Sequence, residues 1–263
     1  MKNLIASLSV FLAVSALAAD AHNAGTVRGA AFLHTLRNSP KIERSGAPLK
    51  CSQGETLAAD GLSAECGKKQ YAALRLSNGA AIIAHPETKF AVESLEQDAP
   101  QTAAATADEF GAYPRARSNS KLAISFSGGR LDFDCPEPTA KSVLVVKTRS
   151  GNFEFRAKSF YIAGGENGIE VVVLDGFAEF KADSGRTDFI RNRQRATVKN
   201  GAEKSDFPLE IEQIGMLRER EISRELAPCR QLRRSVVFGF DTKNGFAAKR
   251  ITPADFLLSA PKN

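Results

Sequence analysis

Short apolar or alternating runs, separated by dipeptides that favour tight turns, occupy most of this chain between about Gln70 and Gly201. Asn-Gly, Asp-Gly, Gly-Gly and Ser-Gly pairs supply the positive φ that tight hairpin turns require. The spacing of these pairs therefore predicts a series of short β-hairpins. The pairs are Asn78-Gly79, Gly128-Gly129, Ser150-Gly151, Asp175-Gly176, Ser184-Gly185 and Asn200-Gly201.

The runs between these turns have the period of β-strands. Phe153 and Phe155 alternate with Glu154 and Arg156, so one face of this run is apolar and the other is polar. A period of two predicts a half-buried antiparallel strand. The run EVVVL at 170–174 is continuously apolar instead, which is typical of a strand covered on both faces. The sequence predicts an all-β fold, namely an antiparallel β-sandwich or roll of short hairpins.

The pattern changes to roughly helical spacing after Gly201. Asp206 is placed to cap a helix and Pro228 to end it, so we expect one helix over 206–228 that packs on the β domain. An extra hairpin is then predicted to turn at Asn244-Gly245. The apolar positions of the predicted helix are Ile211, Ile214, Leu217, Ile222 and Leu226.

The N-terminus has the pattern of a secretory signal peptide. Lys2 precedes an apolar run over 4–17, which ends at the small-residue site Ala16-Leu17-Ala18. This run is shorter than the roughly 20 residues that a membrane-spanning helix needs. We therefore expect cleavage near residue 19 and a periplasmic or secreted protein without stable membrane insertion.

These patterns divide the chain into a signal peptide (1–19), an N-terminal segment (20–49), a β domain (50–203) and a C-terminal helix with a hairpin packed on it (204–263). Residues 96–120 are rich in Ala, Thr, Ser, Asp and Pro and show little periodicity. We expect them to form a mobile insertion in the β domain, either a surface loop or a functional lid.

Four cysteines remain after cleavage, which is an even number in an oxidising compartment and predicts disulfides. Four cysteines allow three pairings, of which we favour Cys51–Cys66 and Cys135–Cys229. The first pair closes a short loop, and the second ties the sheet to the C-terminal segment. Because Cys-x-x-Cys is absent and the histidines are distant in sequence, nothing predicts a metal, a redox centre or any other cofactor.

Residues 54–95 resemble the first half of a FecR-type periplasmic domain. The resemblance rests on a Gly-x-x-Leu start at Gly54 and Leu57, a strand, the Asn78-Gly79 turn and a second strand. The stretches SFSGGRLDFD, VVKTRSGNFEF, EVVVLDGFAEFKA and FIRNRQRATV follow the order of the family's second half, so the resemblance covers about 50–200.

This resemblance implies a periplasmic sensing or docking domain. The sequence departs from the family at Arg156 to Phe160, where RAKSF replaces the usual Arg-Gly-Thr-x-Phe, and its closing strand lacks the usual glycine. The anti-sigma segment and membrane span of the iron-uptake members have no counterpart here. The resemblance therefore does not imply their sigma-regulating mechanism.

The sequence contains no recognisable catalytic set. His85 precedes Pro86 between two strands, and we interpret it as an exposed loop residue because no G-x-S-x-G nucleophile elbow is present. Asp132 and Asp134 alternate with Leu131 and are read as an outward polar face. A glycosidase-type carboxylate pair is the weaker alternative for these two residues. We therefore predict that the protein is not an enzyme.

The charge balance is modestly basic, with 36 basic and 30 acidic residues. Arg230, Arg233 and Arg234 form the densest basic cluster and are the candidate binding residues for an anionic surface; a solvated or acid-paired face is the alternative. A nucleic-acid partner is unsupported. We expect the protein to bind or dock an unidentified envelope protein or glycan, with a role in signalling. An adhesin, or less readily a secreted polysaccharide hydrolase, is the alternative.

Overall fold

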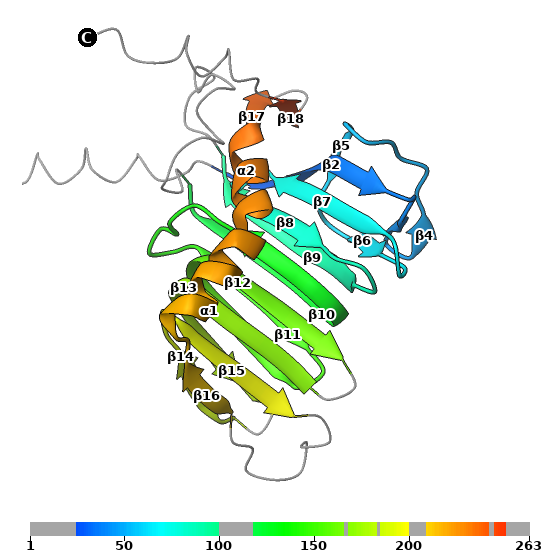
Figure 1. The fold of residues 1–263 in the computed structure, drawn as a ribbon. Helices are drawn as coiled ribbons and strands as arrows, with labels where there is room; N and C mark the ends of the chain where they lie inside the picture. The colour runs from blue at the N-terminus through cyan, green and yellow to red at the C-terminus, as the bar shows by residue number, and fades with distance from the viewer. Residues whose placement is uncertain are drawn as a thin grey trace, which may run out of the picture.

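The computed structural model describes residues 25–99, 118–165, 168–182, 185–199, 209–241 and 245–250. Within them, strands dominate and confirm the predicted all-β class (Figure 1). Sixteen strands form one large sheet, and two more form a separate hairpin. The first nine strands are β1 (Thr26–Arg28), β2 (Ala30–Arg37), β3 (Lys41–Arg44), β4 (Ala47–Pro48), β5 (Thr56–Ala58), β6 (Leu62–Glu65), β7 (Tyr71–Leu76), β8 (Ala81–Ala84) and β9 (Lys89–Asp98).

The second half of the large sheet contains three strands of 14 or 15 residues, far longer than the predicted hairpin arms. These are β10, β12 and β13. The strands from this half are β10 (Ser120–Asp134), β11 (Val143–Thr148), β12 (Gly151–Gly165), β13 (Gly168–Lys181), β14 (Thr187–Ile190), β15 (Gln194–Lys199) and β16 (Glu210–Gln213).

Each long strand changes partners halfway along its length. The first half of β10 pairs with β9 and β11, and its second half pairs with β8 and β12. The same change occurs in β12 at a bulge between Ala157 and Ser159, and in β13 between its β15-paired and β14-paired halves. The sheet therefore folds into two layers that share these strands, and we call this unit the roll.

Layer A contains β6, β9, β11, β14 and the halves of β10, β12 and β13 that pair with them. Layer B contains β2, β7, β8, β15, β16 and the other three halves. One large apolar cluster fills the space between the layers. At its centre, the ring of Phe160 stacks on Phe155 with centroids 4.0 Å apart and on Phe133 with centroids 4.6 Å apart.

Two of the predicted hairpin turns are wrong. At Gly128-Gly129 and Asp175-Gly176 the strand continues and bends, with φ of 83° at Gly129 and 109° at Gly176. A Cβ at Gly129 would lie 2.3 Å from the Thr88 Cα, so only glycine fits this bend without displacing the backbone. These glycines supply positive φ as expected, but they redirect the strand from one layer to the other.

The other turn pairs behave as hairpins wherever the structure describes them. Asn78-Gly79 joins β7 to β8, and Ser150-Gly151 joins β11 to β12. Gly185 lies in the turn between β13 and β14. Asn200-Gly201, the predicted signal peptide at 1–19 and positions 100–117 of the predicted insertion lie outside the described residues.

Strands β1 to β4 fall in the stretch that the sequence analysis assigned to a separate N-terminal segment (20–49). They belong to the large sheet, where β2 pairs with β7, β1 with β9 and β3 with β6.

The predicted C-terminal helix is present, but it forms two short helices that begin at residue 216 rather than one helix over 206–228. Residues 210–213 form the edge strand β16, which is exposed along its whole length and pairs with β15, where Glu210 contacts Lys199 and Glu212 contacts Arg195. The helices are α1 (Met216–Glu225) and α2 (Ala227–Ser235). Pro228 lies in the first turn of α2 rather than ending α1, since a proline is tolerated in the first helical turn.

The predicted extra hairpin follows α2 as β17 (Val236–Asp241) and β18 (Gly245–Arg250), with Asn244 outside the described residues. We call α1, α2, β17 and β18 together the strap. Its helices lie across the outer face of layer B (Figure 1). Among the described residues, no helix is long and apolar enough to cross a membrane.

Candidate functional site

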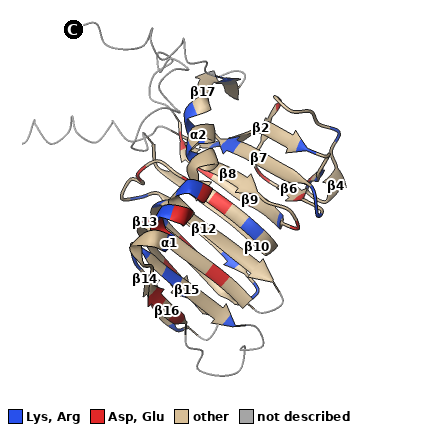
Figure 2. Cartoon of the chain, in the orientation of Figure 1, with Lys and Arg blue, Asp and Glu red and all other residues tan. Residues whose placement is uncertain are grey.

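The candidate carboxylates Asp132 and Asp134 lie on the outer face of layer B, beneath the strap. The interpretation of this face as a solvated one is wrong, because Asp132 is 1% exposed and Asp134 is 4% exposed. Figure 2 shows charged positions of both signs along the helices and on the strands beneath them. The alternation along β10 was correctly identified, but α2, which covers this face, comes about a hundred residues later in the chain.

Asp132 accepts from two cationic or polar partners. His85 Nε2 lies 2.7 Å from its Oδ2, and Arg130 Nε lies 2.8 Å from its Oδ1. Arg130 also pairs with Glu225 of α1 at 2.8 Å, and its guanidinium stacks 4.1 Å from the ring centroid of Tyr161. His85 is thus a partly buried partner of Asp132 and not the exposed loop residue that we expected. This chain of contacts ties the sheet to α1.

Asp134 forms the second link to the strap. The Arg233 Nε donates to the Asp134 carboxylate. The fully buried Arg75 donates to the carbonyl oxygens of Leu76 at 2.9 Å and of Arg233 at 3.2 Å. Because Arg233 lies in the last turn of α2, Arg75 provides a positive charge where the carbonyl groups of that helix end.

The electrostatics of this link reflect burial. Desolvation raises the pKa of Asp134 in spite of the nearby Arg233. The pKa of Arg75 is lowered mainly by desolvation, and to a smaller extent by the positive charge of Arg233. Sequence analysis missed Arg75, although its position within the apolar strand YAALRL is a signal of a buried arginine.

The charged groups around Asp132 and Asp134 link the sheet to the two helices of the strap. Both carboxylates already have positive partners and are almost fully buried, whereas a glycosidase pair must flank its substrate. We name these groups the strap cluster. The strap cluster consists of Arg75, His85, Arg130, Asp132, Asp134, Glu225 and Arg233.

The structure does not bring the three candidate arginines onto one surface. Arg233 is turned toward Asp134, and its side chain is 12% exposed. Arg230 is half-buried and donates to the backbone carbonyl and, at 3.0 Å, to the hydroxyl of Ser223. Arg234 is exposed. The acid-paired alternative therefore describes Arg233.

All four cysteines are free, so neither predicted disulfide is formed in the structure. Cys229 lies between α2 and the outer face of layer B, where its Sγ is 3.3 Å from the Ala81 carbonyl oxygen. Cys135 belongs to the cluster between the layers, on the other side of that sheet. Cys66 is also part of the interlayer cluster, and Cys51 is partly buried against it.

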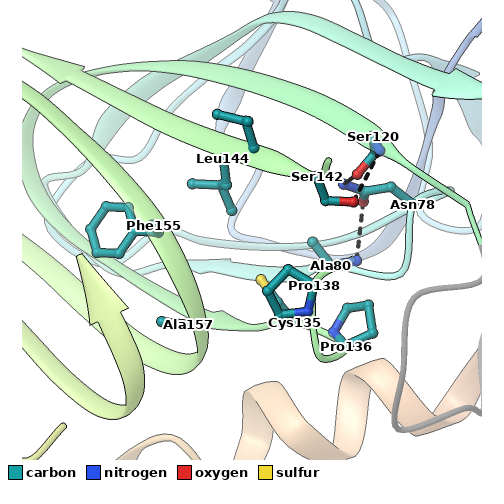
Figure 3. Close-up of a pocket in the computed structure, with 11 residues that line it drawn as sticks. Asn78, Ala80, Ser120, Cys135, Pro136, Pro138, Ser142, Leu144, Phe155 and Ala157 are labelled. Carbon is teal, nitrogen blue, oxygen red and sulfur yellow. Dashed lines mark hydrogen bonds between the residues drawn. The ribbon is translucent and has the colours of Figure 1, made fainter. Parts of the chain in front are cut away.

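A small cavity of about 40 Å³ lies between the β7–β8 turn and the segment after β10 (Figure 3). Asn78 donates to the Ser120 hydroxyl at 3.3 Å, and the Ser142 hydroxyl accepts from the Ser120 amide at 3.1 Å. The space suits ordered water rather than an organic ligand. Burial raises the pKa of the Cys135 thiol that lines it to about 12.

The edge of layer A at β14 is a second candidate surface. Within the described residues, β14 pairs only with β13, so its other side presents backbone groups without a strand partner. Phe189 of β14 is 51% exposed and Phe177 of β13 is 40% exposed. Phe189 lies opposite Glu179, two residues beyond Phe177, so both rings occupy diagonal positions on one face. We call β14 with these two rings the β14 edge.

No protein-family model matches this chain, and no curated protein matches it. Two crystal structures of a "putative anti-sigma factor" from Parabacteroides distasonis ATCC 8503 are similar to it, at 10% and 12% sequence identity with TM-scores of 0.42 and 0.41. Each match covers 58% of this chain and 59% of the other, so the chain spans less than two thirds of the structures it matches. The FecR-type assignment stays a prediction.

Proposed function

We propose that this chain is an exported, non-enzymatic binding domain that docks an extended segment of an envelope protein at the β14 edge. The observation that carries the proposal is the pair of exposed rings, Phe177 and Phe189, beside a strand with one open side. Export rests on the signal-peptide pattern at residues 1–19.

Backbone chemistry favours a polypeptide over a glycan at this edge. An open strand presents N–H and C=O groups at the regular spacing of a β-ladder, which another extended backbone complements. Aromatic rings beside such an edge bury apolar side chains of the added strand. The proposed ligand is therefore a segment with apolar residues at alternate positions, which place one apolar face over Phe177 and Phe189.

The charges on the rest of the outer face of layer A favour a site at the edge of that layer rather than at its centre. Central charges on layer A are paired with one another, as in Lys147–Glu93 at 2.6 Å and Lys181–Glu154 at 3.2 Å. A non-enzymatic role is supported by the buried, ion-paired state of Asp132 and Asp134.

The test is a selection of displayed peptides of roughly ten residues against the purified protein, followed by amide exchange on the complex. Bound peptides are expected to alternate apolar residues and to protect the amides of 187–190. Replacing both rings, Phe177→Lys with Phe189→Lys, should abolish binding. Leu217→Lys is the matched control, because Leu217 is apolar and 77% exposed but lies on α1.

The proposal fails if the selected peptides leave 187–190 unprotected, or if the double variant binds them as well as the control does. Failure to select any peptide would also count against it. Circular dichroism must first show that the double variant is folded. Both rings are largely exposed, so we expect little effect on stability.

A further inference from the structure

We propose that the strap is a releasable cover: it separates from the outer face of layer B as one unit while the roll beneath it stays folded. This inference goes beyond the proposed function, because it involves the outer face of layer B and not the β14 edge of layer A. It rests on how the strap is attached, which differs from how the two layers are attached to each other.

The apolar contacts of the strap are divided into three small patches. By contrast, the layers of the roll enclose one continuous cluster that includes residues from most strands of the large sheet. The first patch joins Cys229 and Leu232 to Ala73, Ala81 and Ile83. The second joins Ile222 and Leu226 to Tyr161, Val172 and Ile214. The third joins Val236 and Phe238 to Ala30 and Phe32.

No β-ladder joins the strap to the roll within the described residues. The strands β17 and β18 pair only with each other, as a separate two-stranded sheet. The hairpin contacts the roll through individual bonds, such as Arg250 to the His34 carbonyl at 3.0 Å and the Ala248 amide to the Thr56 hydroxyl at 3.4 Å. Release of the hairpin therefore breaks no strand pairing of the large sheet.

The strap cluster determines where the strap lies on the sheet more than it stabilises the attached strap. A buried ion pair such as Asp134–Arg233 gains little over its hydrated, separated groups, because both charges lose water on burial. The raised pKa of Asp134 is consistent with this cost. When the strap leaves, these charged groups regain hydration, which lowers the free energy of opening.

The helices also lose their support when they leave the sheet. Since α1 has 10 residues and α2 has 9, neither is long enough to persist alone in water. A released strap therefore gains the conformational entropy of an unfolded segment. Opening is then a local unfolding event, whose free energy is smaller than that of unfolding the roll.

The cysteines provide built-in reporters of this event. Cys229 is 0% exposed in the first strap patch, and its thiol becomes accessible when the strap opens. Cys135 belongs to the interlayer cluster and is 8% exposed, so full access to its thiol requires the roll to open. A maleimide reagent can therefore distinguish the two events.

The experiment compares two full-length proteins, one retaining only Cys229 and the other only Cys135, with alanine at the other three cysteines. Labelling rates are measured at increasing urea. We expect Cys229 to label faster and with a shallower dependence on urea, since opening the strap exposes less surface than opening the roll. Equal rates with equal urea dependence would overturn the proposal.

A matched pair of variants sharpens the test. Leu226→Ala, in the strap, should accelerate labelling of Cys229 by at least about 30-fold and leave that of Cys135 unchanged. Leu131→Ala, in the interlayer cluster, should accelerate labelling of Cys135. If Leu226→Ala accelerates both thiols equally, the strap and the roll are one unit and the proposal fails.

If either single-cysteine protein does not fold, amide exchange on the unaltered chain gives the same comparison. The amides of residues 216–235 should then exchange faster than those of residues 159–163 of β12, because the strap opens more often than the roll. Equal protection of the two segments would overturn the proposal as well.

Discussion

Replacing Gly129 by alanine tests whether the glycines of the long strands form bends rather than turns. Gly129 has φ of 83°, and a Cβ there would lie 2.3 Å from the Thr88 Cα and 2.6 Å from the Glu87 carbonyl oxygen. Both are backbone atoms, so the strand cannot accept the methyl group by a change of rotamer. The backbone at the point where β10 passes between layers must shift instead.

The size of the effect follows from a comparison with Gly46. Gly46 has nearly the same φ, 81°, in the β3–β4 turn, and no described atom lies within 4 Å of a Cβ built there. Alanine at Gly46 should lower the free energy of unfolding by about 1 kcal/mol, because a residue with a Cβ must then adopt the left-handed conformation. Alanine at Gly129 also displaces packed backbone, which typically costs about 1–3 kcal/mol more, for a total of about 2–4 kcal/mol.

Urea unfolding followed by far-ultraviolet circular dichroism measures both variants, and the chain contains no tryptophan for a fluorescence assay. The expected result is a clearly lower midpoint for Gly129→Ala than for Gly46→Ala. If the two variants lose the same free energy of unfolding, the close approach of β10 to Thr88 does not exist in solution. The bent-strand description of the roll would then be refuted.

Three further predictions concern single side chains. Phe160→Ala should cost about 3–5 kcal/mol in the same urea assay, because its ring is fully buried between two phenylalanines; a loss below about 1.5 kcal/mol contradicts the stacking. Burial, and secondly Arg250, lower the pKa of His34 below 6.5, so stability is present above pH 6.5 and is lost as the pH falls through the folded pKa. Amide exchange of β17 and β18 at about pH 7.5 and 5.5 should show this loss, and His34→Gln should remove it. Iodoacetamide at neutral pH should modify the half-buried Cys51 before Cys135, as mass spectrometry of the peptides can verify.

The sequence predicted the strands well, but their connections less well. Asn78-Gly79 and Ser150-Gly151 are hairpin turns as expected. Gly129 and Gly176 carry the same local signal, positive φ at glycine, yet they occur at bends. A dipeptide encodes the local φ, whereas reversal or continuation of the strand depends on partners elsewhere in the chain.

The candidate site was predictable only in part, for a similar reason. The alternation that placed Asp132 and Asp134 on one polar face is local, and it is correct. Their burial is due to α2, which comes about a hundred residues later and brings Arg233 to Asp134. The sequence pattern of a single strand contains no information about such a cover.

The strands that pass through both layers also determine how the roll comes apart. In a sandwich of separate strands, one layer can be lost while the other survives. Here β10, β12 and β13 each contribute half their length to each layer, so the loss of either layer removes pairing partners from the other. The roll is therefore expected to unfold in a single cooperative transition, with no intermediate that retains one layer.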